Sequence, residues 1–326
     1  MTKSRRWLAN AMAAVAAVAV LGAVAPAARA AEPLSVVATT GMIADIVRGV
    51  GGERVRVTQL LGQGVDPHLY KAARSDVAAM LNADATFYNG LLLEGKMTDA
   101  FVRVATSGRP VFAVTELIDE AELLEPEGSL GHFDPHVWMD PRAWGKAVAV
   151  VRDKLSAVDA GSAAIYAANA ARVLEEFERL DAYAARVLAS VPADRRVLVT
   201  AHDAFGYFGK RYDFEVLGIQ GLSTESEAGL KTIEEIVGML VQRRIPAVFV
   251  ESTVPDRSVR ALVAGAAAQG HTVAIGGELF SDAMGRPGTY EGTYVGMIDH
   301  NVTLIARALG GEAPRDGFNG QLAMAR

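Results

Sequence analysis

Two copies of the tripeptide Asp-Pro-His are the feature of this sequence that bears most directly on its chemistry. They are Asp66-Pro67-His68 and Asp134-Pro135-His136. A third histidine, His202, ends an apolar run, and Asp282 follows another. Three imidazoles and one carboxylate form a donor set that suits a transition-metal ion. Because the four residues lie far apart along the chain, only the fold could bring them together.

Each of these residues also has a simpler explanation. Asp-Pro pairs are common turn signals, and a lone histidine in a loop usually makes an ordinary hydrogen bond. Asp282, within Ser-Asp-Ala, could cap a helix. The metal hypothesis depends on the set as a whole, because its members follow apolar runs in both halves of the chain.

Other histidines and carboxylates are secondary candidates. His132, just before the second Asp-Pro-His, is an alternative ligand, and Glu251 is the alternative carboxylate. Asp140 and Asp203 are candidates to accept the second ring N–H of a ligating imidazole. The remaining histidines are expected to be structural: His271 and His300.

Short apolar runs that alternate with helical patterns must position these residues. We predict strands at 34–39, 55–60, 85–88, 111–114, 197–201, 214–218, 247–251 and 272–275. We predict helices at 42–50, 74–81, 95–106, 203–212, 230–243, 256–269 and 294–309. The acidic stretch 117–131 is expected to be a surface loop. Runs that are apolar throughout are typical of parallel strands that helices cover on both faces.

The pattern therefore predicts an α/β protein with two doubly wound parallel-sheet lobes. A stretch without Gly or Pro, 163–190, predicts a rigid connecting helix on the order of 40 Å long. We expect an N-terminal lobe at 31–162, this connecting helix at 163–191, a C-terminal lobe at 192–310 and a frayed tail at 311–326. Ligands of open α/β sheets bind beyond the carboxyl ends of the strands, so the metal site is expected in the cleft between the lobes.

The first 30 residues are typical of an export signal. Lys3, Arg5 and Arg6 precede an apolar stretch, and Ala28-Arg29-Ala30 ends it. We expect cleavage after Ala30 and a periplasmic location. The segment has no Cys that could carry a lipid, so we expect no membrane insertion of the mature protein.

Composition limits the partners further. Removing residues 1–30 takes four of the 32 basic residues and none of the 38 acidic ones, which leaves a net charge of about −10. Such a surface disfavours nucleic acid. The chain has no Cys, so neither thiolate ligands nor disulfides are available.

Five segments resemble the metal-binding solute-binding proteins of zinc and manganese ABC importers, and most closely the TroA-like family. They are LGQGVDPHLY at 61–70, FDPHVW at 133–138, TAHDAFGYF at 200–208, IGGELFSDAMG at 275–285 and GTYVG at 292–296. The resemblance implies a monomeric binding protein, not an enzyme, that delivers one metal ion to a membrane permease. It implies the same ligands as the residue analysis: His68, His136, His202 and Asp282.

Two features bear on whether the metal is Zn²⁺ or Mn²⁺. Zinc-dedicated relatives have a His-rich loop before the second Asp-Pro-His, whereas this chain has only His132 there. Manganese-dedicated relatives have a carboxylate in place of His202. Three imidazoles and one carboxylate favour Zn²⁺, while Asp282 bound through both oxygens would admit Mn²⁺. An exported zinc hydrolase and a metal-stabilised adhesin are the alternative functions, and four protein ligands count against the hydrolase because they leave no position for water.

Overall fold

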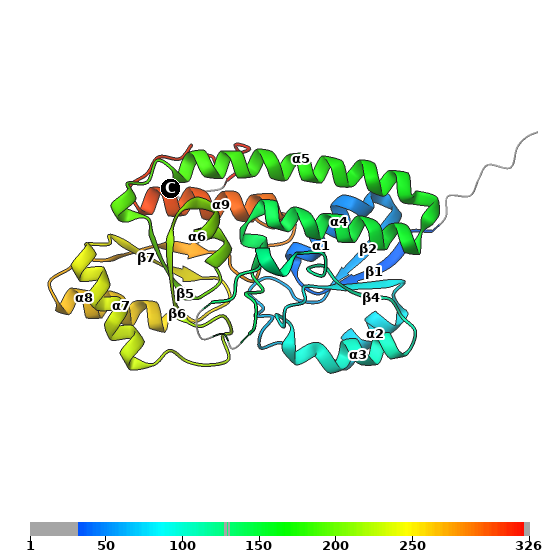
Figure 1. Ribbon diagram of the computed structural model, residues 1–326, viewed down its shortest axis with the longest axis horizontal. Helices are drawn as coiled ribbons and strands as arrows, with labels where there is room; N and C mark the ends of the chain where they lie inside the picture. The colour runs from blue at the N-terminus through cyan, green and yellow to red at the C-terminus, as the bar shows by residue number, and fades with distance from the viewer. Residues whose placement is uncertain (1–31, 127–128, 130, 323–326) are drawn as a thin grey trace, which may run out of the picture. The chain divides into compact units, whose positions relative to one another are not determined.

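The computed structural model describes residues 32–126, 129 and 131–322 (Figure 1). The predicted export signal lies outside these residues, and its cleavage after Ala30 stays a prediction. From Pro33 onward the chain forms one compact unit. Among the described residues, no helix combines the length and the apolar character needed to cross a membrane.

The first half of the chain builds a parallel sheet in the strand order β2-β1-β3-β4. Its strands are β1 (Leu34–Ala38), β2 (Val55–Gln59), β3 (Ala85–Tyr88) and β4 (Val111–Ala113). On one face lie α2 (Arg74–Asn82) and α3 (Thr98–Thr106), and on the other α1 (Gly41–Gly51) and α4 (Pro141–Val158) (Figure 1). Helices on both faces explain why β1 and β3 are buried along most of their length, whereas the edge strand β2 alternates between partly buried and exposed residues.

The second half contains two pairs of parallel strands. β5 (Val197–His202) pairs with β6 (Glu215–Gln220), and β7 (Ala247–Glu251) pairs with β8 (Ala274–Leu279). β5 lies beside β7, so the four strands share one layer. The helices of this half are α6 (Gly206–Tyr212), α7 (Leu230–Arg243), α8 (Arg257–Ala268) and α9 (Tyr294–Ala308). The predicted α/β class with parallel sheets is confirmed.

The long helix α5 (Ala163–Leu188) runs along both halves (Figure 1). It packs against α1 and α4 of the first half and against α6 and α9 of the second. Asp181 on α5 is buried and accepts hydrogen bonds from Arg142 on α4 and Arg211 on α6, at 2.9 and 2.8 Å. The connecting helix is therefore a packed strut, as predicted, and one apolar core continues across both halves.

The structure departs from the predicted local structure at α4, at the end of β8 and in the tail. α4 was not predicted, although Asp140-Pro141 is a typical helix start: the Asp140 carboxylate caps the N–H of Arg142 at 2.8 Å. β8 runs to Leu279 because Gly276 continues the strand, and a Cβ there would lie 2.7 Å from the ring of Phe249.

The tail is the third correction, because the described residues 311–322 are packed rather than frayed. The N–H of Phe318 donates to the Asp299 carboxylate at 2.8 Å, and its ring packs on Tyr183. Leu322 is buried. The lobe boundaries at 31–162, 163–191, 192–310 and 311–326 stay predictions.

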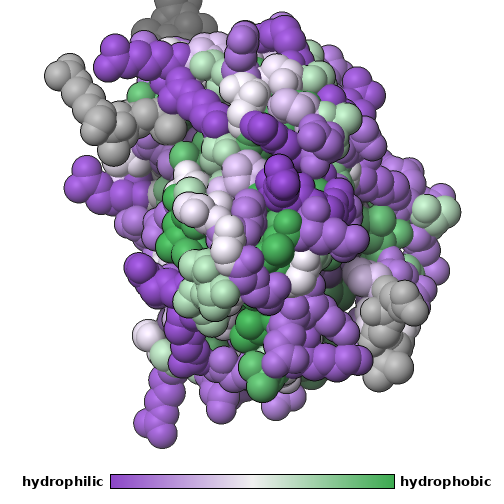
Figure 2. Space-filling model, turned by 90° about the vertical axis from the view of Figure 1, so that its left-hand side faces the viewer, coloured by the Kyte–Doolittle hydropathy of each residue, from purple (hydrophilic) through white to green (hydrophobic). Residues whose placement is uncertain are grey.

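Figure 2 shows the side of the molecule on which α7 and α8 lie. Hydrophilic side chains cover most of this face, and hydrophobic ones occur in small separate groups. Most apolar residues of α7 and α8, such as Ile236, Leu240 and Leu262, face inward instead, against Val199 of β5 and its neighbours, whereas Leu230 at the start of α7 is exposed.

Candidate metal centre

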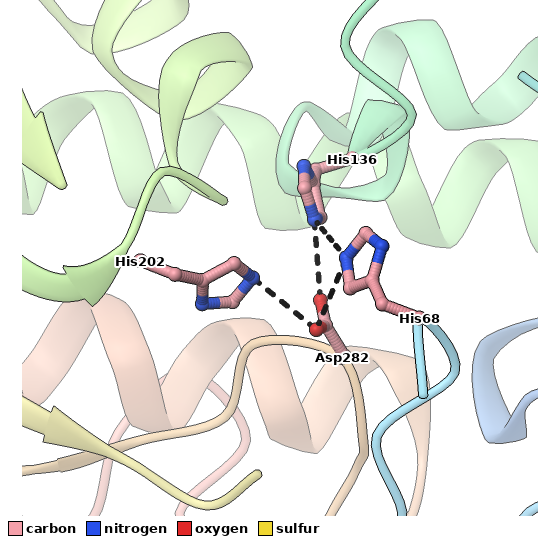
Figure 3. Close-up of side chains that lie close together, drawn as sticks. All are labelled: His68, His136, His202 and Asp282. Atoms are coloured by element: carbon pink, nitrogen blue, oxygen red, sulfur yellow. Dashed lines mark hydrogen bonds and ion pairs between the residues drawn. The ribbon is translucent and has the colours of Figure 1, made fainter. Parts of the chain in front are cut away.

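The four predicted residues lie together between the two halves (Figure 3). His68 comes from the loop between β2 and α2, and His136 immediately precedes a short 3₁₀ turn, η4 (Val137–Met139). His202 is the last residue of β5, and Asp282 lies three residues beyond β8. All four are buried, and one donor atom from each lies within 4.8 Å of the others.

The distances suit a single small cation. Nε2 of His202 lies 3.2 Å from Oδ2 of Asp282, and Nε2 of His136 lies 3.4 Å from Oδ1. Nε2 of His68 lies 3.4 Å from that of His136 and 3.7 Å from Oδ2 of Asp282. A tetrahedral ion with bonds of about 2.0–2.1 Å separates its donor atoms by roughly 3.3 Å. The cluster therefore has the dimensions of a tetrahedral metal site.

The donor atoms have few other partners. Within the part of the chain that the structure describes, Nε2 of His202 and both oxygens of Asp282 are buried and make no hydrogen bond outside the cluster. Buried polar atoms without partners are unfavourable unless a ligand or ion satisfies them. The arrangement therefore offers converging lone pairs to a cation.

Two carboxylates orient two of the imidazoles through hydrogen bonds to the ring nitrogens that face away from the cluster. Oδ1 of Asp134 accepts from Nδ1 of His136 at 2.7 Å, and Oε2 of Glu251 accepts from Nδ1 of His202 at 2.5 Å. These hydrogen bonds orient the two rings so that their Nε2 atoms face the cluster. A Cβ at residue 206 would lie 2.7 Å from Oδ2 of Asp134, so Gly206 lets α6 start close behind this carboxylate.

The pKa values of two histidines diverge. Burial lowers the pKa of His68 to about 3, against the opposing charge of Asp282. Burial also disfavours the charged form of His136, but the adjacent Asp134 carboxylate outweighs it and raises that pKa to about 9. In the metal-free protein His68 is therefore the neutral imidazole, with its lone pair already available.

The other two donors form an ion pair. Burial lowers the pKa of His202, but the charges of Glu251 and Asp282 outweigh it and raise the pKa above its usual range. Burial likewise raises the pKa of Asp282, but His202 and His136 outweigh it and hold this pKa well below its usual value. The carboxylate therefore stays ionised, which is the form that binds a cation.

The secondary candidates have other roles. His132 lines a neighbouring cavity, and Glu251 supports His202 instead of joining the cluster. Asp140 caps α4, and Asp203 lines the same cavity as His132; among the described residues, neither makes a hydrogen bond to an imidazole. The two remaining histidines each donate a ring N–H to a backbone carbonyl, as expected for structural residues: His271 to that of Ile245 and His300 to that of Glu278.

The supporting role of Asp134 was not predicted from the sequence, and Glu251 was predicted as an alternative ligand and not as a support for His202. The signal for Asp134 was in the motif itself, because an Asp two residues before a His can accept its backbone N–H. Both motifs do this, from His68 to Asp66 and from His136 to Asp134, each at 2.8 Å. Nothing in the sequence indicated that Glu251 and His202, 49 positions apart, lie on adjacent strands.

Comparison with known proteins agrees with this fold. The chain belongs to the family described as zinc-uptake complex component A, periplasmic, whose model matches residues 36–308. The family consists of substrate-binding transport proteins and not of enzymes. The predicted relationship to the binding proteins of metal ABC importers is confirmed.

Individual relatives cover most of the chain. The zinc-binding protein TroA of Treponema pallidum is 48% identical over 278 residues, which are 85% of this chain and 89% of TroA. The manganese-binding lipoprotein MntA of Bacillus subtilis is 46% identical over 278 residues, 85% of this chain and 90% of MntA. The solved structure of T. pallidum TroA superposes with a TM-score of 0.82 at 47% identity, covering 85% of this chain and 99% of that one.

Proposed function

We propose that this protein captures one divalent transition-metal ion at His68, His136, His202 and Asp282 and delivers it to the permease of an ABC importer. The observation that carries the proposal is the convergence of three Nε2 atoms and one ionised carboxylate within 4.8 Å in a buried site. Family membership supports the same conclusion, because the relatives named above bind zinc or manganese according to their names.

The donor set favours zinc as the more tightly bound ion. Three imidazoles and one carboxylate complete a tetrahedral shell, and Zn²⁺ binds nitrogen donors more strongly than Mn²⁺ does. Manganese stays a candidate cargo, because Asp282 can supply both oxygens and because availability in the cell decides uptake together with affinity. The names of the relatives include both metals.

Four protein donors also argue against the alternative of a zinc hydrolase. A catalytic zinc keeps one position for water and needs a general base beside it. Here the carboxylates next to the cluster, Asp134 and Glu251, are bound to the Nδ1 atoms of His136 and His202. The site is therefore suited to holding a metal rather than to activating water.

The remaining parts of the proposal concern the cellular setting. We propose export to the periplasm with cleavage after Ala30, and action as a monomer. The names of several relatives describe lipoproteins of metal transporters, which agrees with a location outside the cytoplasm. N-terminal sequencing of the exported protein tests the cleavage site, and light scattering during size-exclusion chromatography tests the monomer.

Elemental analysis tests the proposal directly. Metal-free protein is exposed to equimolar Zn²⁺ and Mn²⁺, desalted and analysed, beside His202→Ala and Asp282→Ala. We expect about one metal per parent chain, mostly zinc, and strong loss in both variants. His300→Ala is the matched control, because it removes an imidazole away from the cluster and should retain the metal. A parent protein without stoichiometric metal would refute the proposal.

A further inference from the structure

The two Asp-Pro-His motifs differ in how the second half of the chain holds them. The second motif has several fixed contacts there. Nε1 of Trp138 donates to the carbonyl of Ser281 at 2.9 Å, directly beside Asp282, and the Tyr207 hydroxyl donates to the Asp134 carbonyl at 3.0 Å. His136 itself is fully buried. This side of the site is closed and firmly joined.

The second half of the chain contacts the first motif mainly through one side-chain hydroxyl, that of Thr224. The Asp66 carboxylate uses Oδ1 to accept the backbone N–H of His68, at 2.8 Å. Its other oxygen, Oδ2, accepts the hydroxyl of Thr224 at 2.5 Å. Thr224 belongs to the loop between β6 and α7, residues 221–229, in the opposite half of the chain. One carboxylate therefore links this loop to the backbone of His68.

A second contact joins the same loop to the first half. Nζ of Lys96 lies 3.1 Å from Oε1 of Glu225, the residue next to Thr224. Both side chains are partly exposed, at 29% and 51%, so solvent screens this ion pair and its contribution is small. The hydrogen bond from Thr224 to Asp66 is consequently the stronger of the two links.

His68 is also the donor that faces open space. It lines a cavity of about 510 Å³ together with Leu92, Asp203 and Ser223. In the part of the chain that the structure describes, its Nδ1 makes no hydrogen bond to a carboxylate, unlike those of His136 and His202. No carboxylate therefore holds its ring through Nδ1, and Asp66 acts on this ligand through the backbone N–H.

We propose that Thr224 is a positioning residue for His68, and that breaking its hydrogen bond to Asp66 is the first step of metal release. Once the 221–229 loop withdraws, Asp66 loses one of its two partners and His68 can turn toward the cavity. The ion then leaves on the His68 side, while His136, His202 and Asp282 stay in place. This inference rests on the proposed function of the site.

The test is the rate of zinc dissociation from the full chain into an excess of a chromophoric chelator, followed by stopped flow. Thr224→Val removes the hydroxyl and keeps the shape. We expect its dissociation rate to rise roughly ten-fold, with little change in the association rate, because one hydrogen bond to a charged group is lost. Thr224→Ser restores the hydroxyl and should dissociate at nearly the parent rate.

Two further variants separate this role from a general loss of structure. Thr106→Val removes an exposed hydroxyl bond to the Val102 carbonyl at the end of α3 and should leave the rate unchanged. In an Asp66→Ala background, Thr224→Val should add nothing, because the two residues act through one bond.

The outcomes distinguish this inference from the proposed function. A parent that binds one zinc, together with a Thr224→Val variant that releases it at the parent rate, would overturn the inference alone. Equal acceleration by Thr224→Ser and Thr224→Val, or additive effects with Asp66→Ala, would also overturn it. A parent that binds no metal would overturn the proposed function.

Discussion

The two Asp-Pro-His motifs have the same three residues and the same hydrogen bond between Asp side chain and His backbone, but their surroundings differ. In both, the Asp carboxylate accepts the N–H of the His two positions later, at 2.8 Å. In the second motif the same oxygen also accepts a hydrogen bond from the Nδ1–H of the His136 ring. In the first motif the carboxylate reaches Thr224 across the site instead, and His68 lines a cavity. The comparison shows that a repeated sequence can supply one permanently fixed ligand and one that depends on a contact between the two halves.

The largest expected effect comes from removing the imidazoles themselves. A structural zinc site releases about 10–16 kcal/mol, so one of four ligands accounts for roughly 3 kcal/mol, or about 100-fold in affinity. We expect His68→Ala to lose about this much and His136→Ala to lose more, because Asp134 already holds the ring of His136 in its binding orientation. Competition titrations with a chelator measure both. A smaller loss in His136→Ala than in His68→Ala would break the comparison.

Neutralising the carboxylates that support the imidazoles should change metal affinity by different amounts in the two motifs. Asp134→Asn weakens the hydrogen bond that orients His136, and we expect metal affinity to fall about 10- to 100-fold. Asp66→Asn keeps an oxygen for the N–H of His68 and should cost less than about ten-fold. Glu251→Gln, behind His202, should match Asp134→Asn. Equal losses in the two motif variants would show that both carboxylates have the same role.

A smaller effect is expected from substituting Asn89, a residue of the first half of the chain that contacts the second motif. Its Nδ2 donates to the Pro135 carbonyl at 3.1 Å, and its backbone N–H donates to the buried Glu94 at 2.9 Å. We expect Asn89→Ala to lower the free energy of unfolding by about 1–2 kcal/mol and metal affinity by only a few-fold. Urea denaturation and metal titration measure the two quantities. An unchanged stability would mean that the loop at 135 is held from the second half alone.

The smallest effect on metal binding is expected at Asp181, which joins the halves far from the cluster through Arg142 and Arg211. Burial raises the pKa of Asp181, but these arginines outweigh it and lower the pKa below its usual value. The stabilisation is therefore complete above about pH 4 and is lost as the pH falls through the lowered pKa. Asp181→Asn should cost about 2 kcal/mol at pH 7, with the difference from the parent disappearing as the pH falls below the lowered pKa.

Urea denaturation of the parent and Asp181→Asn at several pH values checks this dependence. Metal affinity at pH 7 should change less than about two-fold, because both motifs keep their local hydrogen bonds. A large loss of affinity would show instead that α5 sets the distance between the two motifs.

Much of the fold could be predicted from the sequence because most of its parallel strands are short, largely apolar runs. The errors occurred where tertiary packing decides the local structure. Gly276 resembles a turn signal, but the ring of Phe249 occupies the space of its Cβ and makes glycine the residue that β8 needs. The start of α4 carried a usable signal in Asp140-Pro141, whereas the packing of the tail through Phe318 had none.

The metal site likewise has a part that could be predicted from the sequence and a part that could not. The four cluster residues were predictable because each follows a strand or a conspicuous motif, and carboxyl ends of parallel strands collect at one edge. The hydrogen bonds between Glu251 and His202 and between Thr224 and Asp66 could not be predicted, because these pairs lie 49 and 158 positions apart. Their proximity depends on strand order and loop course, which short-range patterns do not encode.

X-ray absorption at the zinc edge of the one-to-one complex tests the central claim most directly, since it counts and identifies the atoms around the metal. The account predicts three imidazole nitrogens and carboxylate oxygen at about 2.0–2.2 Å. His68→Ala, His136→Ala and His202→Ala should each remove one imidazole from the spectrum, and His300→Ala should remove none. A parent spectrum with fewer than three imidazoles, or one that these substitutions leave unchanged, would contradict the account.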